Sequence, residues 1–475
     1  MTARDESLQA EDVLLFAGGP VWALAWSPAL PSDGNDYLAV ACHRPGHERH
    51  LIGEPAQGPH MLQLWAVPRA AEGQGAALPW VASLVSHDGD HINALAWCPH
   101  AGEADPRRLG LLALSRGDGA VCVYTMSRAQ PGTKGAIVDE ASVLVARLDC
   151  RALLGGALPS CLDWDARSGD TLVAGCWDGS ALVLRLSGSS IQNAGGAPGL
   201  EVLTRIQAGS IALRAVACLP PDDNGEEEGH ARGSDASTRL EDPPTMPALS
   251  RSSTSAVIFG TACQDGTMAI WDARDPVVPQ HTQLLTTGCL YAASWSLRPR
   301  GLLCACDDGA VRGVPVDAAV VARDSADSSR KIQTAIPWRG AGQGALWGLH
   351  VLPGMDLTAY GGEDGVIAVF PAGFQQDARK RRPHQPVGGF VYDEATQALQ
   401  VLTVRDLGPS HGLYSGKAVD RLRAVKGTPL PPLEQCILRL AWHPTYGAGQ
   451  ASHAGNRLAT GLACGVVRLQ TIYVH

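Results

Sequence analysis

The feature that most limits how this chain can fold is a short hairpin motif that occurs five times. In each copy an Asp-Gly pair separates two apolar, strand-like runs, as in GTACQDGTMAIWDARDP from Gly260 to Pro276. Such a pair predicts a tight β-hairpin, in which both central turn positions need positive φ. Five copies exceed chance and indicate a structural repeat. The pairs are Asp118-Gly119, Asp178-Gly179, Asp265-Gly266, Asp308-Gly309 and Asp364-Gly365.

A second recurring element, an apolar strand that ends in Trp, precedes most of these hairpins. Pro follows several of these strands and helps to end them, because it cannot donate to a β-ladder. Two weaker copies, around Cys218 and His350, bring the number of units to seven. The clear copies end at Trp26, Trp97, Trp164, Trp295 and Trp442.

A fourth strand can be placed after most hairpins, as VASLVS, SVLVARL, EVLTRI, TQLLTT, KIQTAI and ALQVLTV. The seventh unit, RLATGLACGVVRLQTIYVH, has only three strands, and DVLLF at 12–16 can supply its missing outer strand. Pairing the two ends of the chain removes the exposed edges of the ring. The sequence therefore predicts an all-β fold, a seven-bladed WD40-type β-propeller over 12–474 whose ring is closed by the N-terminal strand.

The wide spacing of the units predicts inserted loops within this single domain, and residues 1–11 are expected to be a disordered N-terminus. Segment 220–255 is acidic and rich in Pro, Ser and Gly, which is typical of disorder. Segment 371–432 is basic, with nine Lys and Arg against five acids. The remaining insertions are expected at 127–141, 187–200 and 317–330.

Composition narrows the class of protein. The net charge of −9 argues against a surface that coats nucleic acid by charge alone. No apolar run is long enough to span a membrane, and the polar, acidic start does not resemble a signal peptide. Most of the 13 cysteines lie in apolar runs, where Cys acts as a small hydrophobe. We expect reduced thiols in a cytosolic or nuclear protein.

Several residues are candidates for a functional site, each with a simpler structural explanation. Turn chemistry accounts for the Asp of each Asp-Gly pair, and packing between blades accounts for the repeated Trp residues. Cys42, His43, His47 and His50 could bind zinc, but a solvated loop is favoured. No GxSxG, HExxH or phosphate-loop motif is present, so we expect neither catalysis nor a cofactor.

The basic run Arg379, Lys380, Arg381 and Arg382 is the clearest charged patch. It could serve as a nuclear import signal or contact phosphates of DNA. A solvated loop explains it equally well.

The first blade resembles a particular WD40 branch, the propeller subunit of RNA polymerase III transcription factor IIIC and its plant relatives. The resemblance covers about 55 residues, from a Gly-Gly-x-Val-Trp strand to a final Gln-Leu-Trp strand. Elsewhere the match is to generic WD40 repeats, and only Trp271-Asp272 keeps the signature dipeptide. The matching residues are Gly18, Gly19, Val21, Trp22, Trp26, Pro28, Tyr37, Leu38, Ala39, Val40, His43, Pro45, Gln63, Leu64 and Trp65.

This resemblance implies a nuclear, non-catalytic scaffold that docks on the other transcription factor IIIC subunits. It implies support for promoter DNA binding at tRNA genes, indirectly or through the basic loop, with no membrane and no small-molecule substrate. Within the loop 42–60, we expect His43, His47, Arg49 and His50 to contact a partner. Two alternatives remain open: a generic WD40 adaptor, such as a ubiquitin-ligase substrate receptor or chromatin scaffold, and a propeller enzyme.

Overall fold

A computed structural model gives the fold of the chain. It describes residues 12–28, 34–44, 54–55, 58–69, 77–100, 108–129, 134–187, 199–221, 257–297, 300–316, 336–338, 344–352, 354–355, 357–372, 384–407, 431–444 and 456–472.

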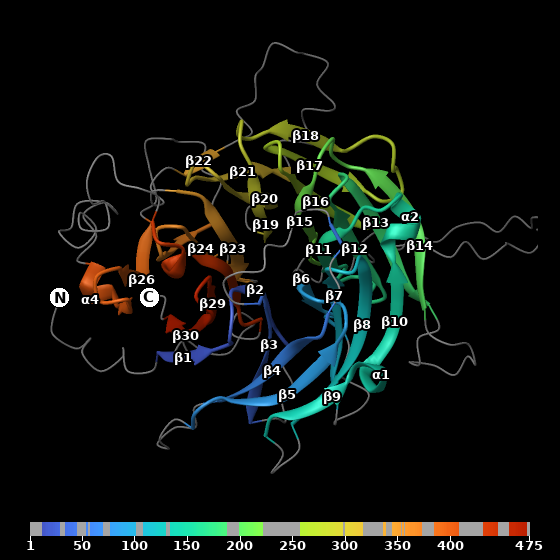
Figure 1. Cartoon of the computed structure of the whole chain (residues 1–475). Helices are drawn as coiled ribbons and strands as arrows, with labels where there is room; N and C mark the ends of the chain where they lie inside the picture. Colours follow the sequence, from blue (N-terminus) through green and yellow to red (C-terminus); the bar gives the residue numbers. More distant parts are fainter. Residues whose placement is uncertain are drawn as a thin grey trace, which may run out of the picture.

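Seven twisted sheets follow one another around a ring, which confirms the predicted β-propeller (Figure 1). Blade one contains β2 (Val21–Trp26), β3 (Asn35–Cys42), β4 (His60–Pro68), β5 (Trp80–His87) and β9 (Ala136–Asp139). Blade two contains β6 (Ile92–Trp97), β7 (Arg108–Arg116), β8 (Ala120–Ser127) and β10 (Leu144–Asp149). Blade three contains β11 (Pro159–Trp164), β12 (Thr171–Cys176), β13 (Ser180–Ser187) and β14 (Gly199–Gln207).

The second half of the ring repeats this plan. Blade four contains β15 (Leu213–Cys218), β16 (Ile258–Cys263), β17 (Thr267–Asp272) and β18 (His281–Leu284). Blade five contains β19 (Leu290–Leu297), β20 (Arg300–Cys306), β21 (Val311–Pro315) and β22 (Ile336–Trp338). Blade six contains β23 (Leu346–Leu352), β24 (Leu357–Gly362), β25 (Val366–Pro371), β26 (Gln385–Asp393) and β27 (Ala398–Leu402). Blade seven contains β28 (Ile437–Trp442), β29 (Asn456–Leu462), β30 (Val466–Ile472) and β1 (Val13–Phe16).

Among the residues that the structure describes, helical structure consists of short segments between strands. These are α1 (Glu140–Val143), α2 (Cys150–Leu154), α4 (Val404–Leu407) and the 3-10 turn η1 (Leu433–Gln435). Across the described ranges, no helix has the length and hydropathy that crossing a membrane requires.

The N-terminal strand closes the ring, as the sequence predicts. β1 pairs antiparallel with β30, with Val13 opposite Leu469, and so becomes the outer strand of blade seven (Figure 1). Arg468 on β30 reinforces this closure: its guanidinium pairs with Asp12 and donates to the Leu402 carbonyl of blade six at 3.1 Å. The side chain of Arg468 is only 1% exposed, so this contact ties both ends of the chain to the neighbouring blade.

The five Asp-Gly pairs form hairpin turns, but their geometry differs from the prediction. Each Gly has positive φ, whereas Asp90 and Gln397 are the only non-glycine residues with positive φ in the described ranges. The Gly N–H closes a four-residue turn, and the Asp carboxylate accepts from the backbone N–H two residues later, at 2.9–3.3 Å. Asp is favoured here because it bonds its own turn. A sixth turn, in blade seven, has Cys464 in place of Asp.

The Trp residues at the ends of inner strands link consecutive blades, as expected. Each indole N–H donates to the backbone carbonyl on the preceding inner strand, at 2.8–3.1 Å. Blades four and six have Cys218 and Val351 in the place of Trp. There the backbone N–H donates instead to a side chain of the preceding blade, Asp163 at 2.8 Å and Ser294 at 3.1 Å. The chain of contacts therefore runs around the whole ring.

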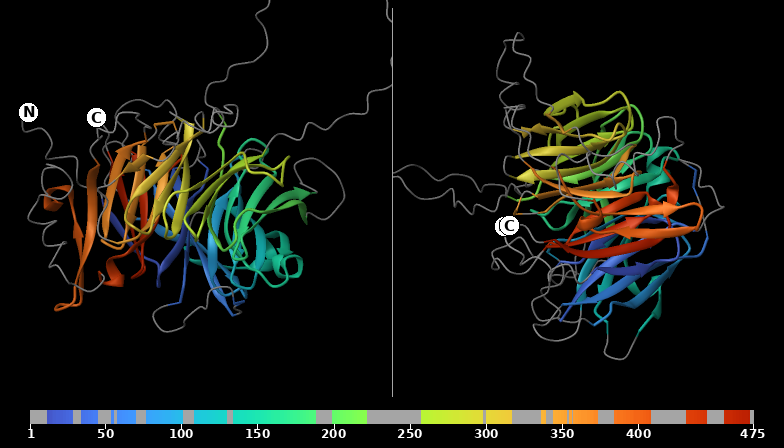
Figure 2. Two further views of the ribbon diagram at one scale, coloured as in Figure 1. Left: turned by 90° about the horizontal axis from the view of Figure 1, so that it is seen from above. Right: turned by 90° about the vertical axis from the view of Figure 1, so that its left-hand side faces the viewer.

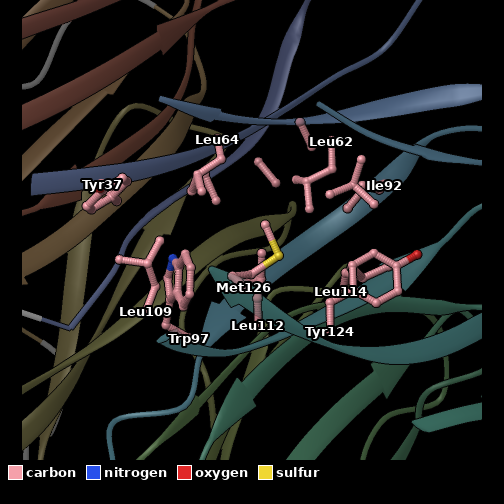
Figure 3. Close-up of a cluster of buried hydrophobic side chains, with 14 of the residues drawn as sticks. Tyr37, Leu62, Leu64, Ile92, Trp97, Leu109, Leu112, Leu114, Tyr124 and Met126 are labelled. Carbon is pink, nitrogen blue, oxygen red and sulfur yellow. The ribbon is translucent and has the colours of Figure 1, made fainter. Parts of the chain in front are cut away.

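The hydrophobic core lies between adjacent blades rather than at one centre. Figure 3 shows the cluster between blades one and two, where Leu62 and Leu64 face Leu112 and Leu114, all fully buried. The two turned views show the blades side by side around the ring (Figure 2). The described cysteines are free, and all but Cys289 and Cys464 are buried.

The fourth strands mostly lie where the sequence places them, apart from those of blades five and six, and the difference is clearest in blade six. β26 is the fourth strand there, and the predicted strand at ALQVLTV is β27, a fifth strand outside it. The sequence does not predict β26 because this strand contains Pro386, Gly388 and Gly389, and Pro and Gly normally interrupt strands. A Cβ at Gly388 would lie 2.5 Å from Arg468 Nη1, so the guanidinium occupies the space that a side chain there would need.

Some predicted insertions contain ordered structure. Segment 127–141 includes β9, which pairs in parallel with β5 of blade one, and segment 371–432 includes β26 and β27. β9 was not predicted because its four residues, Ala-Ile-Val-Asp, are too few to show a periodic pattern in the sequence. The predicted fourth strand of blade five, KIQTAI, overlaps β22 only at Ile336. Residues 188–198, 222–256 and 317–335 lie outside the described residues, with 1–11, 373–383 and 408–430.

Candidate functional site at one end of the ring axis

Every inner strand begins with a β-bulge that leaves its second residue out of register with the next strand. A bulge re-aims the side chain of the extra residue. The seven residues at this position lie at the end of the ring axis near the Asp-Gly turns. They are Trp22, Asn93, Ser160, Arg214, Tyr291, Trp347 and Leu438.

The larger of these side chains form one connected group. Tyr291 stacks on Trp347 with ring centroids 4.1 Å apart, and Trp347 lies 6.4 Å from Trp22. Arg214 lies over Tyr291 at 5.7 Å and over Trp177 at 5.0 Å, which joins blade three to blades four and five. Arg439, the next residue along from Leu438, lies over Trp22 at 5.2 Å. We call Trp22, Trp177, Arg214, Tyr291, Trp347 and Arg439 the axial cluster; all six are half-buried.

The electrostatics of the axial cluster are cationic. Burial and the nearby positive charge of Arg214 lower the pKa of Arg439 to about 10. A guanidinium titrates far above this value in water, so Arg439 is held in a place that disfavours its charge. Burial also raises the pKa of Tyr291 to about 12, so its hydroxyl stays protonated.

Apolar and neutral polar groups complete the surroundings of the cluster. Trp22 and Trp347 pack against Leu438 and Ala463 of blade seven. Asn93 donates to the Pro159 carbonyl at 3.2 Å, linking blades two and three. The axial cluster therefore combines aromatic faces, two cations and an apolar base, which suits binding of a side chain rather than proton transfer.

The predicted docking loop 42–60 enters this region from blade one, where it takes the place of an Asp-Gly turn. His43 stacks on Trp22 at 4.7 Å and lies 4.7 Å from His91. A hollow of about 300 Å³ beside it is lined by residues that include Cys42, His43, Arg44 and His60. His47, Arg49 and His50, like Arg379, Lys380, Arg381 and Arg382, lie outside the described residues.

The structure argues against Cys42 as a zinc ligand in this loop. Cys42 Sγ donates to the Ala17 carbonyl at 3.4 Å, and burial raises the pKa of the thiol to about 12. Zinc requires the thiolate, which burial disfavours here. Within the described part of the chain, no three His, Cys, Asp or Glu side chains are grouped to hold a metal.

Two carboxyl groups have strongly shifted pKa values, which is often a sign of catalysis. Burial raises the pKa of both Asp163 and Asp364 to about 7. Both have structural roles: Asp163 accepts from the Cys218 N–H of the next blade, and Asp364 bonds its own Asp-Gly turn through the Val366 N–H. Neither lines the hollow beside blade one.

Sequence reasoning did not identify Arg214, Tyr291, Trp347 or Arg439. The available signal was positional: each inner strand carries one variable residue directly after its first apolar residue. Because the residue type changes from blade to blade, no repeated motif marks this position.

Comparison with known proteins supports a relationship for part of the chain. No family model matches the sequence. The chain is 29% identical over 155 residues to General transcription factor 3C polypeptide 2 of Homo sapiens and to the same polypeptide of Pongo abelii. The match covers 30% of this chain and 17% of each relative, so the chain corresponds to a small part of these proteins.

A solved structure shares the whole architecture. The crystal structure of Saccharomyces cerevisiae Sqt1 aligns over 97% of this chain and 98% of that chain, with a TM-score of 0.50 and 11% identity. At this identity the likeness shows the β-propeller fold alone.

Proposed function

We propose that this chain is a non-catalytic WD40-type scaffold subunit of a transcription factor IIIC complex. It holds other subunits of the complex on its propeller surfaces and acts in the nucleus. It thereby supports promoter binding for RNA polymerase III transcription of tRNA genes. The observation that carries this proposal is the 29% identity over 155 residues to a general transcription factor 3C polypeptide.

The surfaces of the ring support a docking role. A closed propeller presents its turns and loops on two faces, and binding in such a fold depends on these surfaces. At the axial end, the cluster of aromatic and cationic groups is partly exposed. The loop with His43, His47, Arg49 and His50 begins beside this cluster and is our candidate for a partner contact.

We propose that any contact of this chain with DNA is local rather than spread over a broad surface. The chain carries a net charge of −9, which disfavours broad binding along a phosphate backbone. The run Arg379, Lys380, Arg381 and Arg382 is the proposed point for phosphate contact or for nuclear import. Changing these four residues to Ala is expected to weaken DNA binding by the complex or to reduce nuclear entry. Unchanged DNA affinity together with unchanged nuclear entry would reject a role for this run.

The proposed function is tested by affinity purification of the tagged full chain from nuclear extract of its source, with bound proteins identified by mass spectrometry. We expect the other subunits of transcription factor IIIC in near-stoichiometric amounts. Recovery of cullin-type ligase components would support a ubiquitin-ligase adaptor instead, and absence of a stable partner would also refute the assignment. A chain with Trp164→Phe, altered between two blades away from the proposed contacts, controls for loss of partners through reduced stability.

A further inference from the structure

Two arginines of the axial cluster lack the partners that other buried arginines have. Arg214 and Arg439 lie on blades four and seven, opposite each other in the ring. Within the described residues neither has a carboxylate at ion-pair distance, and the hydrogen bond of Arg439 is to its neighbour's carbonyl, Leu438 O at 2.8 Å. The aromatic faces of Trp22, Trp177 and Tyr291 are their other contacts.

Comparison with arginines elsewhere in the molecule shows that this is unusual. The poorly exposed side chains of Arg116, Arg312, Arg457 and Arg468 each pair with an aspartate. A charge removed from water without a counterion is costly, so proteins normally pair such groups. Contact with aromatic faces offsets only a small part of this cost. The two axial arginines are thus set up for an anion that the described chain does not supply.

We propose that the axial cluster is a docking site for a peptide segment of a partner protein that carries one Asp or Glu among neutral or basic residues, and whose carboxylate pairs with Arg214 and Arg439. A guanidinium matches the two oxygens of a carboxylate and binds it with parallel hydrogen bonds. The indole N–H of Trp347 is buried in the same cluster with no hydrogen-bond partner among the described residues.

The charges around the cluster favour a peptide over a nucleic acid. Three carboxylates lie on or beside turns at this end of the ring and accept hydrogen bonds from neutral groups: Asp265 from the Ser210 hydroxyl, Asp307 from the Thr286 hydroxyl and Glu363 from the Ala345 N–H. The charges of Asp307 and Glu363 reach Tyr291, where they raise the pKa of its hydroxyl. A run of phosphates would be repelled by these carboxylates. A single carboxylate with neutral or basic neighbours fits a cationic centre inside an acidic rim.

This inference refines the proposed scaffold role by naming the class of partner segment. Its test uses the purified full chain and needs no transcription factor, so the two proposals can fail separately.

The test compares binding of the full chain to two immobilised libraries of capped nonapeptides. The flanking residues are randomised, and the central residue is Glu in one library and Gln in the other. We expect about tenfold stronger binding to the Glu library, as for a partly desolvated charge-assisted hydrogen bond. Arg439→Gln and Arg214→Gln are each expected to bring the ratio close to one. Arg274→Gln, which alters an exposed arginine paired with Asp272, is the matched control and should keep the ratio.

Three results would overturn the proposal. Equal binding of the unaltered chain to both libraries would remove the carboxylate preference. A preference that survives in both Arg214→Gln and Arg439→Gln would place the site elsewhere. Binding of a DNA duplex that depends on these arginines, with no Glu preference, would identify phosphate as the anion and a nucleic acid as the partner. Arg214→Gln decides the question if Arg439→Gln does not fold, which thermal unfolding of each variant shows.

Discussion

The hydrogen bonds from inner-strand tryptophans to the preceding blade are predicted to stabilise the ring, and Trp164→Phe tests this directly. Trp164 is 3% exposed, and its indole N–H donates to the Ala96 carbonyl of blade two at 2.9 Å. Phe keeps an aromatic ring at the blade interface but removes the donor and part of the ring volume. The change therefore isolates the inter-blade bond and the packing around it.

The expected loss of stability follows from two contributions. A buried carbonyl deprived of its donor costs about 1–3 kcal/mol. The space left by the missing part of the indole adds about 1 kcal/mol. We therefore expect Trp164→Phe to lower the free energy of unfolding by about 2–4 kcal/mol.

Urea-induced unfolding followed by far-ultraviolet circular dichroism measures this difference. The midpoint should fall while the dependence on urea concentration stays the same, because the folded surface hardly changes. Trp177→Phe is the matched control, since Trp177 is half-buried at a turn and, unlike Trp164, its indole N–H donates no inter-blade hydrogen bond within the described residues. We expect a loss of less than about 1 kcal/mol for this control. Equal losses for the two variants would show that the inter-blade hydrogen bond contributes nothing beyond general packing.

Three further predictions concern ring closure, pH and thiol reactivity. Arg468→Met should destabilise the chain by about 2–4 kcal/mol in urea unfolding, because it leaves the half-buried Asp12 carboxylate and the carbonyls of Gly389 and Leu402 without their donor; a loss within 1 kcal/mol would contradict the closing role. Burial raises the pKa of Asp163 from 3.8 to about 7, so between these pH values Asp163 is protonated in the folded chain and ionised in the unfolded chain. The stabilisation that this proton gives is complete below about pH 4 and is lost as the pH rises through 7. Asp163→Asn should therefore gain stability relative to the unaltered chain between pH 5 and pH 8, and a pH-independent difference would refute the shift. Cys289 and Cys464 are the cysteines that are not buried, so a thiol reagent should modify at most these two of the 13 before unfolding, and rapid reaction of further thiols would contradict the packing.

Much of the fold could be predicted because the turns and the contacts between blades each require particular residue types, which recur in the sequence. Gly is needed at Gly119, where φ is +89°, and its neighbour Asp118 bonds the same turn, so the pair is visible in the sequence. The tryptophans that join blades are equally visible, because one residue type serves the same contact repeatedly.

The errors occurred where packing against a distant segment overrides local preference. β26 forms despite Gly388, because the space beside this residue holds Arg468 from blade seven. β9 forms because the edge of blade one is available to it, although its own residues give no strand pattern. The axial cluster was not predictable for a related reason: Arg214 and Arg439 are far apart in the sequence and come together only because the closed ring brings blades four and seven to a common axis.

Closure of the ring by β1 also determines the order in which the protein can be completed during synthesis. Val13 is synthesised before the strands of the other blades, whereas its partner Leu469 lies on the last strand of the ring. Until then β1 has no sheet to join, and the growing stack of blades keeps an unpaired edge at its advancing end. Pairing residues so far apart carries a large loop-closure cost and comes late in folding. Before β1 and β30 pair, the chain is therefore an open ring, and its unpaired edge is exposed to association with other chains.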